Sequence, residues 1–505
     1  MLKYFSLLFV LFSYQAFAQI DFCTPELETY PTLAGGREKP LYVLSIETVK
    51  FMTGDSKIGD LSATEAFCKL SLKAFGMPLE LPVLIKVDHV DVKKFLGMSE
   101  NQTSLPVLQV LGKTSDIETE IAGLKENTSY KKELNKVSQR IGTYQAIVEG
   151  RAWSVPMTKN GKIEFVPVTE FLTQERVAAA QNSGQNPVKF LFEQAKEDYL
   201  KLNGDAYLLE LTYFKLNLFL WAMFASLLAI LLLAGLKNKT PGTILGIISI
   251  GLQIAGMVMR IIISHRAPVT NMYETVMFSG LGCLILSCII TIVRKEYAFM
   301  IAGLSFNVLT LMMMRFANGM LDPHISPLVP VLRDNFWLST HVTTVILSYA
   351  ALALSWVLAN ALLIRSRFFT VSAEEYRYQA DLTYTAIKCG VVLLATGVIL
   401  GGVWADYSWG RFWGWDPKET WSLIVLLIYM AILHGRYTSW IPPKRFVPLV
   451  AAAFMSVMMA WFGVNYILAS GLHSYGFSEG GAIFLGSFFA IQIAILAVST
   501  IKKNP

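Results

Sequence analysis

The chain has 505 residues, of which 54% are hydrophobic, and its mean hydropathy is +0.47. These values exclude an ordinary soluble protein of this size and indicate a membrane protein. The formal net charge of +6 is spread thinly along the chain. It therefore argues against a partnership with nucleic acid and is informative only about membrane topology.

The N-terminal segment MLKYFSLLFVLFSYQAFAQ has the pattern of a secretory signal. A lysine precedes a short apolar core, and Ala16-Phe17-Ala18 matches the small-x-small pattern that signal peptidase cuts after. We therefore predict a cleaved signal peptide over residues 1–18, with an uncleaved anchor helix as the alternative. Cleavage would place the polar region that follows outside the cytoplasm.

Residues 19–210 are predicted to form an extracytoplasmic α+β domain. Short strand-like pieces such as LPVLIKV alternate with charged helical pieces such as KENTSYKKELNKVSQRI. No catalytic motif stands out there, and His89 is interpreted as a solvated surface residue. Cys23 and Cys68 could pair in this domain, but nothing in the sequence requires it.

The rest of the chain is predicted to lie in a membrane. Apolar runs long enough to cross ~30 Å of hydrocarbon recur from residue 211 onwards, so that a first helix precedes a membrane domain over residues 237–505. The nine predicted spans are 211–236, 241–263, 272–293, 297–314, 340–365, 385–404, 421–437, 446–470 and 480–501. The predicted fold class is a polytopic α-helical membrane protein of about nine transmembrane helices with an N-terminal extracytoplasmic α+β domain.

The short loops between these helices predict the orientation of the chain. If residues 19–210 lie outside, every predicted inner loop is basic, as the positive-inside rule requires. The loops carry Lys237, Lys239, Arg294, Lys295, Arg365, Arg367, Lys444, Arg445, Lys502 and Lys503. This topology puts the connection between the sixth and seventh helices at the outer face of the membrane.

That connection, WADYSWGRFWGWDPKETW at residues 404–421, interleaves tryptophans with charges. It contains Trp404, Trp409, Trp413, Trp415 and Trp421, together with Asp406, Arg411, Asp416, Lys418 and Glu419. One interfacial tryptophan is usually a membrane anchor, but five of them beside Gly410 and Gly414 exceed what an aromatic belt needs. We interpret the segment as an apolar platform for a large planar ligand.

Histidines flank this platform in the predicted topology. His341 lies at the outer start of the fifth helix and His473 just beyond the outer end of the eighth, where both could bind the metal of a planar macrocycle such as haem. For each histidine the alternative is a hydrogen-bonded interfacial residue. Arg411 and Lys418 could meet haem propionates, and Asp406, Asp416 and Glu419 could pair with these bases or accept an imidazole N–H. For all five, solvated interfacial charge is the alternative.

His434 lies towards the inner end of the seventh predicted helix. A histidine inside a membrane helix is costly unless it faces the interior of the bundle, so it is a functional candidate. A second haem site, a proton relay and an interhelical hydrogen bond all remain open for it. Arg260 and His265 are interpreted as part of an interfacial turn.

These residues resemble a known family. The stretch WGRFWGWDPKETWSLI is similar to the tryptophan-rich WWD signature of haem-handling proteins. The stretches HRAPVTNMYETVMF, PLVPVLRDNFWLSTHVTTVILSYAAL and FGVNYILASGLHSYG resemble the System II cytochrome c biogenesis family called CcsA or ResC. This resemblance runs from about residue 240 to the C-terminus. PTLAGGREKPLYVLSIETVKFMTG and LPVLIKVDHVDVKKFLGM resemble the extracytoplasmic CcsB/ResB-like segment of some fused synthases.

The resemblance implies a component of holocytochrome c synthase in the bacterial inner membrane, with the N-terminal domain and the WWD segment on the periplasmic side. Haem b would be held between His341 and His473 and attached to an apocytochrome c that carries reduced Cys-x-x-Cys-His. His434 matches the internal histidine of the family. A thiol-reducing thioredoxin-like protein is a further implied partner.

One departure from fused synthases concerns the internal site. They pair the internal histidine with another from an early helix, whereas residues 211–236 contain no histidine. We therefore expect a separate ResB/CcsB-like membrane subunit to supply the missing ligand.

Three other functions compete with this interpretation. A System I-type haem chaperone or exporter shares the WWD signature, but the stretches around His341 and His473 argue against it. A membrane b-type electron-transfer cytochrome would need histidine pairs stacked across the bilayer. A transporter of another substrate would show broken helices and polar residues at the midplane. The chain contains no Cys-x-x-Cys-His and so does not itself attach haem through thioethers.

Overall fold

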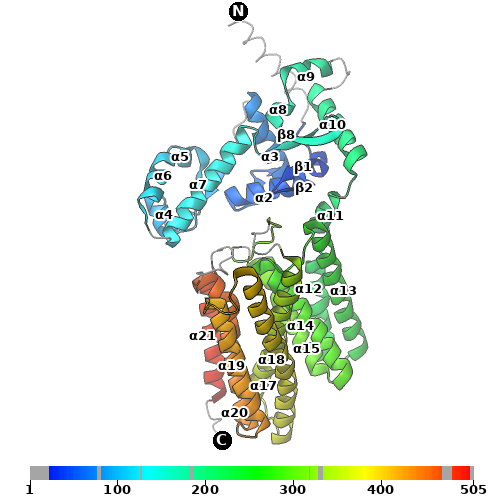
Figure 1. Ribbon diagram of the computed structural model, residues 1–505, viewed down its shortest axis with the longest axis vertical. Helices are drawn as coiled ribbons and strands as arrows, with labels where there is room; N and C mark the ends of the chain where they lie inside the picture. The colour runs from blue at the N-terminus through cyan, green and yellow to red at the C-terminus, as the bar shows by residue number, and fades with distance from the viewer. Residues whose placement is uncertain are drawn as a thin grey trace, which may run out of the picture. The chain divides into compact units, whose positions relative to one another are not determined.

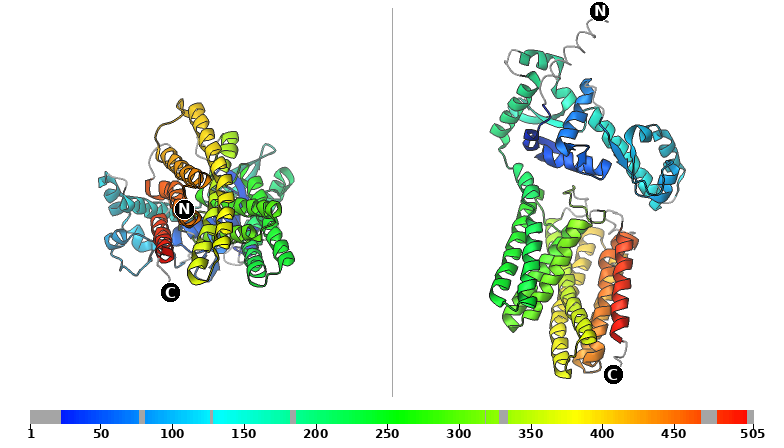
Figure 2. Two further views of the ribbon diagram at one scale, coloured as in Figure 1. Left: turned by 90° about the horizontal axis from the view of Figure 1, so that it is seen from below. Right: turned by 180° about the vertical axis from the view of Figure 1, so that it is seen from behind.

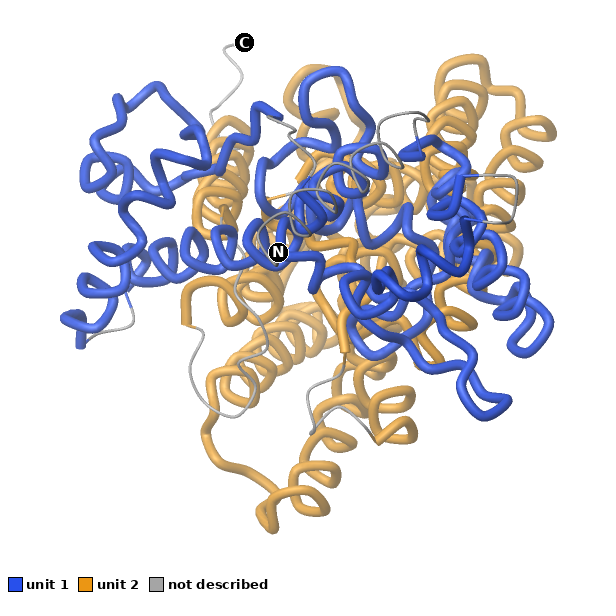
Figure 3. Tube along the Cα trace, turned by 90° about the horizontal axis from the view of Figure 1, so that it is seen from above, with its two compact units in different colours: residues 1–215 blue, residues 216–505 orange. Residues whose placement is uncertain are grey.

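The computed structural model describes residues 22–76, 81–125, 128–181, 186–317, 319–327, 334–468 and 480–500. The chain divides into two compact units, with the boundary between Lys215 and Leu216 (Figure 3). The predicted signal peptide over residues 1–18 and the candidate ligand His473 both lie outside the described residues.

The described part of the first unit combines helices with antiparallel two-stranded sheets, which confirms its predicted α+β character. The pairs are β1 (Pro31–Ala34) with β2 (Arg37–Pro40), β3 (Lys57–Ile58) with β4 (Leu61–Ser62), β5 (Leu84–Lys86) with β6 (Ser104–Pro106), and β7 (Ser154–Lys159) with β8 (Lys162–Pro167). Its helices are η1 (Pro25–Thr29), α2 (Leu41–Thr53), α3 (Ala63–Ser71), η2 (Leu72–Phe75), α4 (Val90–Phe95), α5 (Val107–Leu111), α6 (Thr114–Gly123), α7 (Ser129–Val148), α8 (Val168–Phe171), α9 (Gln174–Ala180), α10 (Pro187–Asn203) and α11 (Leu208–Leu216).

Local sequence signals and one covalent bond fix parts of this unit. Ser62 and Glu65 form a reciprocal capping box that starts α3, in which each side chain accepts from the other residue's backbone N–H. Cys23 and Cys68 form a disulfide, with their Cα atoms 5.6 Å apart. The pairing that the sequence left open therefore joins the beginning of the described chain to α3.

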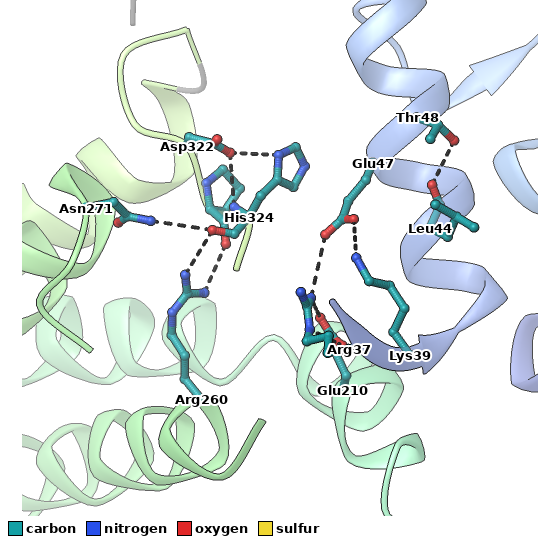
Figure 4. A network of polar contacts seen from close by, with 11 residues as sticks. Arg37, Lys39, Leu44, Glu47, Thr48, Glu210, Arg260, Asn271, Asp322 and His324 are labelled. Carbon is teal, nitrogen blue, oxygen red and sulfur yellow. Dashed lines mark hydrogen bonds and ion pairs between the residues drawn. The ribbon is translucent and has the colours of Figure 1, made fainter. Parts of the chain in front are cut away.

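Ion pairs hold α11 within the first unit. The buried carboxylate of Glu210 accepts from Arg37, and Glu47 of α2 lies 3.9 Å from Arg37 and 2.7 Å from Lys39 (Figure 4). Helix α11 is also the beginning of the first membrane span, Leu208–Gly235. Between α11 and the next helix of this span stands Asn217, which adopts a left-handed φ of +48°.

The described residues contain nine helical spans that are long and apolar enough to cross a membrane, which confirms the predicted number. The first span begins in the first unit with α11, and the others lie in the second unit. The first span combines α11 with α12 (Leu218–Ile230) and the π-helical η4 (Leu231–Gly235). The next three are α13 (Lys239–Ser264), α14 (Met272–Arg294) and α15 (Tyr297–Phe316). The fifth comprises α16 (Asn335–Trp337), the π-helical η6 (Leu338–Val342) and α17 (Thr343–Phe368). The others are α18 (Ala373–Trp409), α19 (Pro417–Tyr437), α20 (Pro443–Met458) with the π-helical η7 (Met459–Leu468), and α21 (Gly481–Thr500).

The long helices of the second unit run side by side as a bundle (Figures 1 and 2). Helix α17 is its central member, because it contacts α14, α15, α18, α20 and α21. Serine, alanine and leucine side chains cover most of its buried surface. The bundle therefore presents the ends of several helices around the start of α17, where His341 lies.

Helix α18 is longer than the predicted span 385–404. It begins after Ser372, whose side chain caps Glu375 N–H, and it ends at Gly410, which adopts a left-handed φ of +67°. The prediction counted only apolar residues, whereas polar residues extend the same helix at both ends. Trp404 and Trp409 are consequently helical, and the loop of the tryptophan segment is shorter than the sequence suggested.

Candidate functional site

A cavity opens in the second unit where several helix ends meet. Its empty volume, including space open to the surroundings, is about 1250 Å³. The cavity is lined by residues from six parts of the second unit. These are residues 269–275 before and in α14, residues 338–349 of η6 and α17, residues 398–409 of α18, the connection at 412–413, the first turns of α19, and η7. Most of the lining is apolar, with a small number of polar groups, which is typical of a ligand site.

Six of the sequence-predicted residues line this cavity together: His341, Trp404, Trp409, Trp413, Lys418 and Glu419. The structure thus brings one candidate axial ligand to three rings, one ammonium group and one carboxylate. The His341 and Trp404 rings meet edge to face, with centroids 5.7 Å apart. One histidine and the tryptophan segment therefore share a single wall, although 63 residues separate these two positions in the sequence.

Trp415 and Trp421 are not among the residues that line the cavity. Trp415 is 71% exposed and meets Trp413 edge to face, with ring centroids 6.0 Å apart. Trp421 lies on α19 and packs against the core of the helix bundle. The five tryptophans are therefore divided between the cavity wall, the outer surface and the bundle core.

The charges of the connection hold its backbone. Asp416 caps α19 by accepting from Lys418 N–H at 2.9 Å, and Glu419 completes the capping box through Asp416 N–H at 3.3 Å. Glu419 also accepts from Gly414 N–H at 2.6 Å and lies 3.4 Å from an Arg411 nitrogen. The guanidinium of Arg411 lies 5.8 Å from the centroid of the Trp409 ring. Arg411 thus links two parts of the tryptophan segment.

The environment of His341 determines which of its nitrogens carries the proton. Its Nδ1 lies 2.9 Å from the carbonyl oxygen of Gly397 on α18. A carbonyl can only accept a hydrogen bond, so Nδ1 must donate its proton. In the neutral ring the lone pair is then on Nε2, which is the state that a metal-ligating histidine requires.

His434 lies far from this cavity. It stands 17 positions after Pro417 on α19, which corresponds to ~25 Å along the helix axis at ~1.5 Å per residue. Its Nδ1 donates to the carbonyl of Met430, 2.8 Å away and one turn earlier. Two residues later, Arg436 forms an ion pair with Asp381 of α18 at 2.7 Å. His434 therefore belongs to the opposite end of the bundle.

His473 lies outside the described residues, but the helix before it reaches the cavity. Asn465 of η7 lines the cavity and stands eight positions before His473. The side-chain nitrogen of Asn465 donates to the Met272 sulfur at 3.2 Å. Trp461, one turn earlier, donates its indole N–H to Thr275 at 3.1 Å. The π-helical end of this span is thereby fixed to the start of α14.

Residues 269–272, which follow the interfacial turn predicted at His265, form one wall of the cavity. A buried ion pair holds it: Arg260 and Glu274 are both 0% exposed and 2.8 Å apart. Glu274 also accepts from the backbone N–H and the hydroxyl of Thr270, at 2.8 and 2.6 Å. An arginine and a glutamate inside apolar runs were the signal that could have revealed this network, because such charges persist in a membrane only when paired.

The same arginine anchors the loop between α15 and α16. Its two terminal nitrogens donate to the carbonyls of Pro323 and His324, at 3.0 and 3.4 Å, and Asn271 donates to the second of these carbonyls at 3.4 Å (Figure 4). Asn271 also caps α14 by accepting from Glu274 N–H at 2.8 Å. One cluster thus joins α13, α14 and the described part of the loop that leads to His341.

We expect the Asp322 contact in this loop to weaken in acid. Burial alone would raise the pKa of Asp322, but hydrogen bonds from His324 and the charges of His324 and Arg260 outweigh it and lower that pKa. A carboxylate with a depressed folded-state pKa stabilises the fold above its usual pKa of about 4 and loses this contribution as the pH falls through the folded-state value. The melting temperature of the wild type should fall as the pH is lowered from 7 to 3. The fall should be smaller in Asp322→Asn, which has no carboxylate to protonate at this position. Identical pH profiles would contradict this expectation.

Comparison with known proteins assigns the chain to a family. A family model described as cytochrome c assembly protein matches residues 269–473. The cytochrome c biogenesis protein CcsA of Mesostigma viride is 31% identical over 294 residues, which cover 50% of this chain and 95% of that protein. CcsA of Prochlorococcus marinus (strain NATL2A) is 30% identical, with 51% of this chain and 92% of that protein covered. Protein NrfI of Wolinella succinogenes is 34% identical over 48% of this chain but only 27% of its own length. The likeness of the first unit to a CcsB/ResB segment stays a prediction. The chain belongs to the CcsA family of cytochrome c biogenesis proteins.

Proposed function

We propose that the cavity binds haem b and presents it for covalent attachment to apocytochrome c, as part of a holocytochrome c synthase of the bacterial inner membrane. Membership of the CcsA family supports a role in cytochrome c maturation, and with it the handling of haem. The observation that carries the proposal is the position of His341, an imidazole that donates its Nδ1–H to the Gly397 carbonyl from the wall of an apolar, tryptophan-lined cavity. A planar macrocycle with a central iron fits these two properties together.

The polar groups of the wall suit the carboxylates of such a macrocycle. The indole nitrogens of Trp404 and Trp413 are buried and have no hydrogen-bond partner among the residues that the structure describes. Buried N–H donors without a partner are rare in native proteins, because desolvating them is costly. Lys418 adds a positive charge to the same wall. The Glu419 carboxylate lies in the same wall but already accepts from Arg411 and from two backbone N–H groups. The two indole N–H donors and the ammonium group therefore favour an anionic ligand such as haem with its propionates.

The chemistry that this arrangement would support is the addition of thiols to vinyl groups. Each cysteine sulfur of Cys-x-x-Cys-His forms a bond to one vinyl carbon while its proton passes to the other, so the addition involves no net oxidation or reduction. The protein would contribute mainly by holding the two reactants in place, which is a large effect for a reaction between two molecules. No side-chain nucleophile is needed for this step.

The remaining ligands and the topology are part of the same proposal. His473 would be the second axial ligand, which the position of Asn465 in the cavity wall supports. His434 would mark an internal haem site, with a ResB/CcsB-like subunit supplying its second ligand. The cavity and the first unit would face the periplasm, where the apocytochrome and a thioredoxin-like reductant act.

Removing the two indole N–H groups is expected to weaken haem binding without removing the rings. A hydrogen bond to a charged group contributes about 1.5–3 kcal/mol, so Trp404→Phe and Trp413→Phe should each lower haem b affinity by roughly 10-fold or more. The measurement is titration of the purified full chain with haem b and with its dimethyl ester. The ester lacks the carboxylate charge, and its affinity should change much less.

Trp415→Phe is the matched control for this experiment, since Trp415 belongs to the same segment but is exposed and does not line the cavity. It should bind haem b like the wild type. An equal loss for haem b and the ester in the two cavity variants would contradict the proposed role of the indole N–H groups. Wild-type protein that binds no haem b at all would refute the proposed function itself.

A further inference from the structure

Two glycines on one face of α18 form the surface on which the His341 ring lies. A Cβ atom built on Gly401 would stand 2.6 Å from Cε1 of His341, 3.1 Å from Nδ1 and 3.3 Å from Nε2. Real Cβ atoms essentially never approach another heavy atom closer than 3.0 Å. The imidazole therefore occupies its observed position only because residue 401 has no side chain.

Gly397, one turn earlier on the same face, brings the two helices together. A Cβ atom on Gly397 would stand 2.7 Å from Cγ2 of Val345, 3.3 Å from its backbone nitrogen and 3.4 Å from its Cα. Backbone atoms of α17 cannot move aside as the end of a flexible side chain can. The spacing of four residues is the one that lets membrane helices approach closely.

The two glycines also explain how the Gly397 carbonyl, inside helix α18, can accept a hydrogen bond from the His341 side chain. The Gly397 carbonyl is already the acceptor for the N–H four residues later, as in any α-helix. Because side chains of a helix lean towards its N-terminus, a side chain at 401 would cover the second lone pair of this oxygen. Glycine at 401 leaves that lone pair accessible, and Nδ1 of His341 lies 2.9 Å from the oxygen.

We propose that Gly397 and Gly401 are positioning residues for His341, which fix its tautomer and its orientation so that Nε2 presents a lone pair to haem iron. This inference rests on the proposed function, because it gives His341 the role of an axial ligand. Metal-ligating histidines commonly donate their second ring N–H to a carbonyl or carboxylate, and losing that partner typically lowers metal affinity 10- to 100-fold. The bond here goes to the backbone, so only the glycines can be varied.

Gly401→Ala in the full-length protein tests the proposal. We expect haem b affinity to fall at least ~10-fold, with a changed absorption spectrum and reduction potential of the bound haem, because the added methyl group displaces the ring. Gly486→Ala is the matched control, as a Cβ atom there meets nothing within 4 Å. It should leave affinity, spectrum and potential unchanged. A Gly401→Ala protein with wild-type values for all three would overturn the proposal.

A second measurement distinguishes displacement of the ring from general misfolding. In a His341→Gly background the clash with the ring no longer exists, so Gly401→Ala should lower the melting temperature of the haem-free protein much less than it does in the presence of His341. Equal losses in both backgrounds would show that residue 401 acts on helix packing alone and would overturn the proposal. This comparison needs no haem, so it remains informative if the proposed function fails.

Discussion

His341→Ala is expected to abolish covalent attachment of haem to a co-expressed apocytochrome c. His341 lies in the cavity wall, and because its Nδ1 donates to Gly397, the neutral ring carries its lone pair on Nε2. Without it the iron loses an axial ligand, and the macrocycle is no longer held in the position that vinyl chemistry requires. Haem staining of the apocytochrome after denaturing electrophoresis measures attachment, and the spectrum of the purified membrane protein measures haem retention.

The matched control is His265→Asn. His265 belongs to the same unit but does not line the cavity, and it ends α13 in a left-handed conformation with φ +54°, which asparagine tolerates well. This variant should attach haem as the wild type does. If it loses attachment to the same degree as His341→Ala, the loss reflects general damage and not a missing ligand.

A cavity-creating variant separates ligation from packing at this position. His341→Gly with added imidazole should regain haem binding and part of the attachment, because free imidazole can supply the missing nitrogen. Methylcyclopentane or another apolar compound of similar size should not restore either. Rescue by the apolar compound, or its failure with imidazole despite a folded protein, would contradict the axial role of His341.

The membrane helices could be predicted from the sequence because hydrocarbon thickness sets a length that apolar runs must match. Helix α18 shows the limit of that argument. Its polar N-terminal part, from Ala373 onwards, continues the helix beyond the apolar run, and hydropathy carries no information about helices outside hydrocarbon. The π-helical segments at His341 and before His473 likewise leave no hydropathy signal, since one extra residue per turn does not change the composition.

The contacts around His341 could not be predicted from spacing. Its hydrogen bond to Gly397 spans 56 residues and depends on the close approach of α17 and α18. The sequence did contain one signal that was missed: Asp416, Pro417 and Glu419 have the pattern of a capped helix start, with proline at the first position and glutamate at the third. Two of the charges expected to support a ligand thus also begin α19.

Arg260→Met is expected to be the most destabilising substitution of a single charge in the described part of the second unit. Arg260 and Glu274 are fully buried, and removing one partner leaves the other charge unpaired, at a typical cost of about 3–5 kcal/mol. The melting temperature of the purified full chain in detergent measures the loss. Arg365→Met is the matched control, because its ion pair with Glu375 at 2.7 Å is half-exposed, and such a pair contributes at most about 1 kcal/mol.

The double variant Arg260→Met/Glu274→Met shows whether the unpaired charge is the cause. It should lose clearly less stability than the two single variants added together, because no buried charge remains. Some loss should persist, since Thr270 and the carbonyls of Pro323 and His324 also lose their partners. Additive losses would show that the two side chains act independently. Because the network holds residues 269–272 in the cavity wall, the double variant should remain folded yet bind haem more weakly than the wild type.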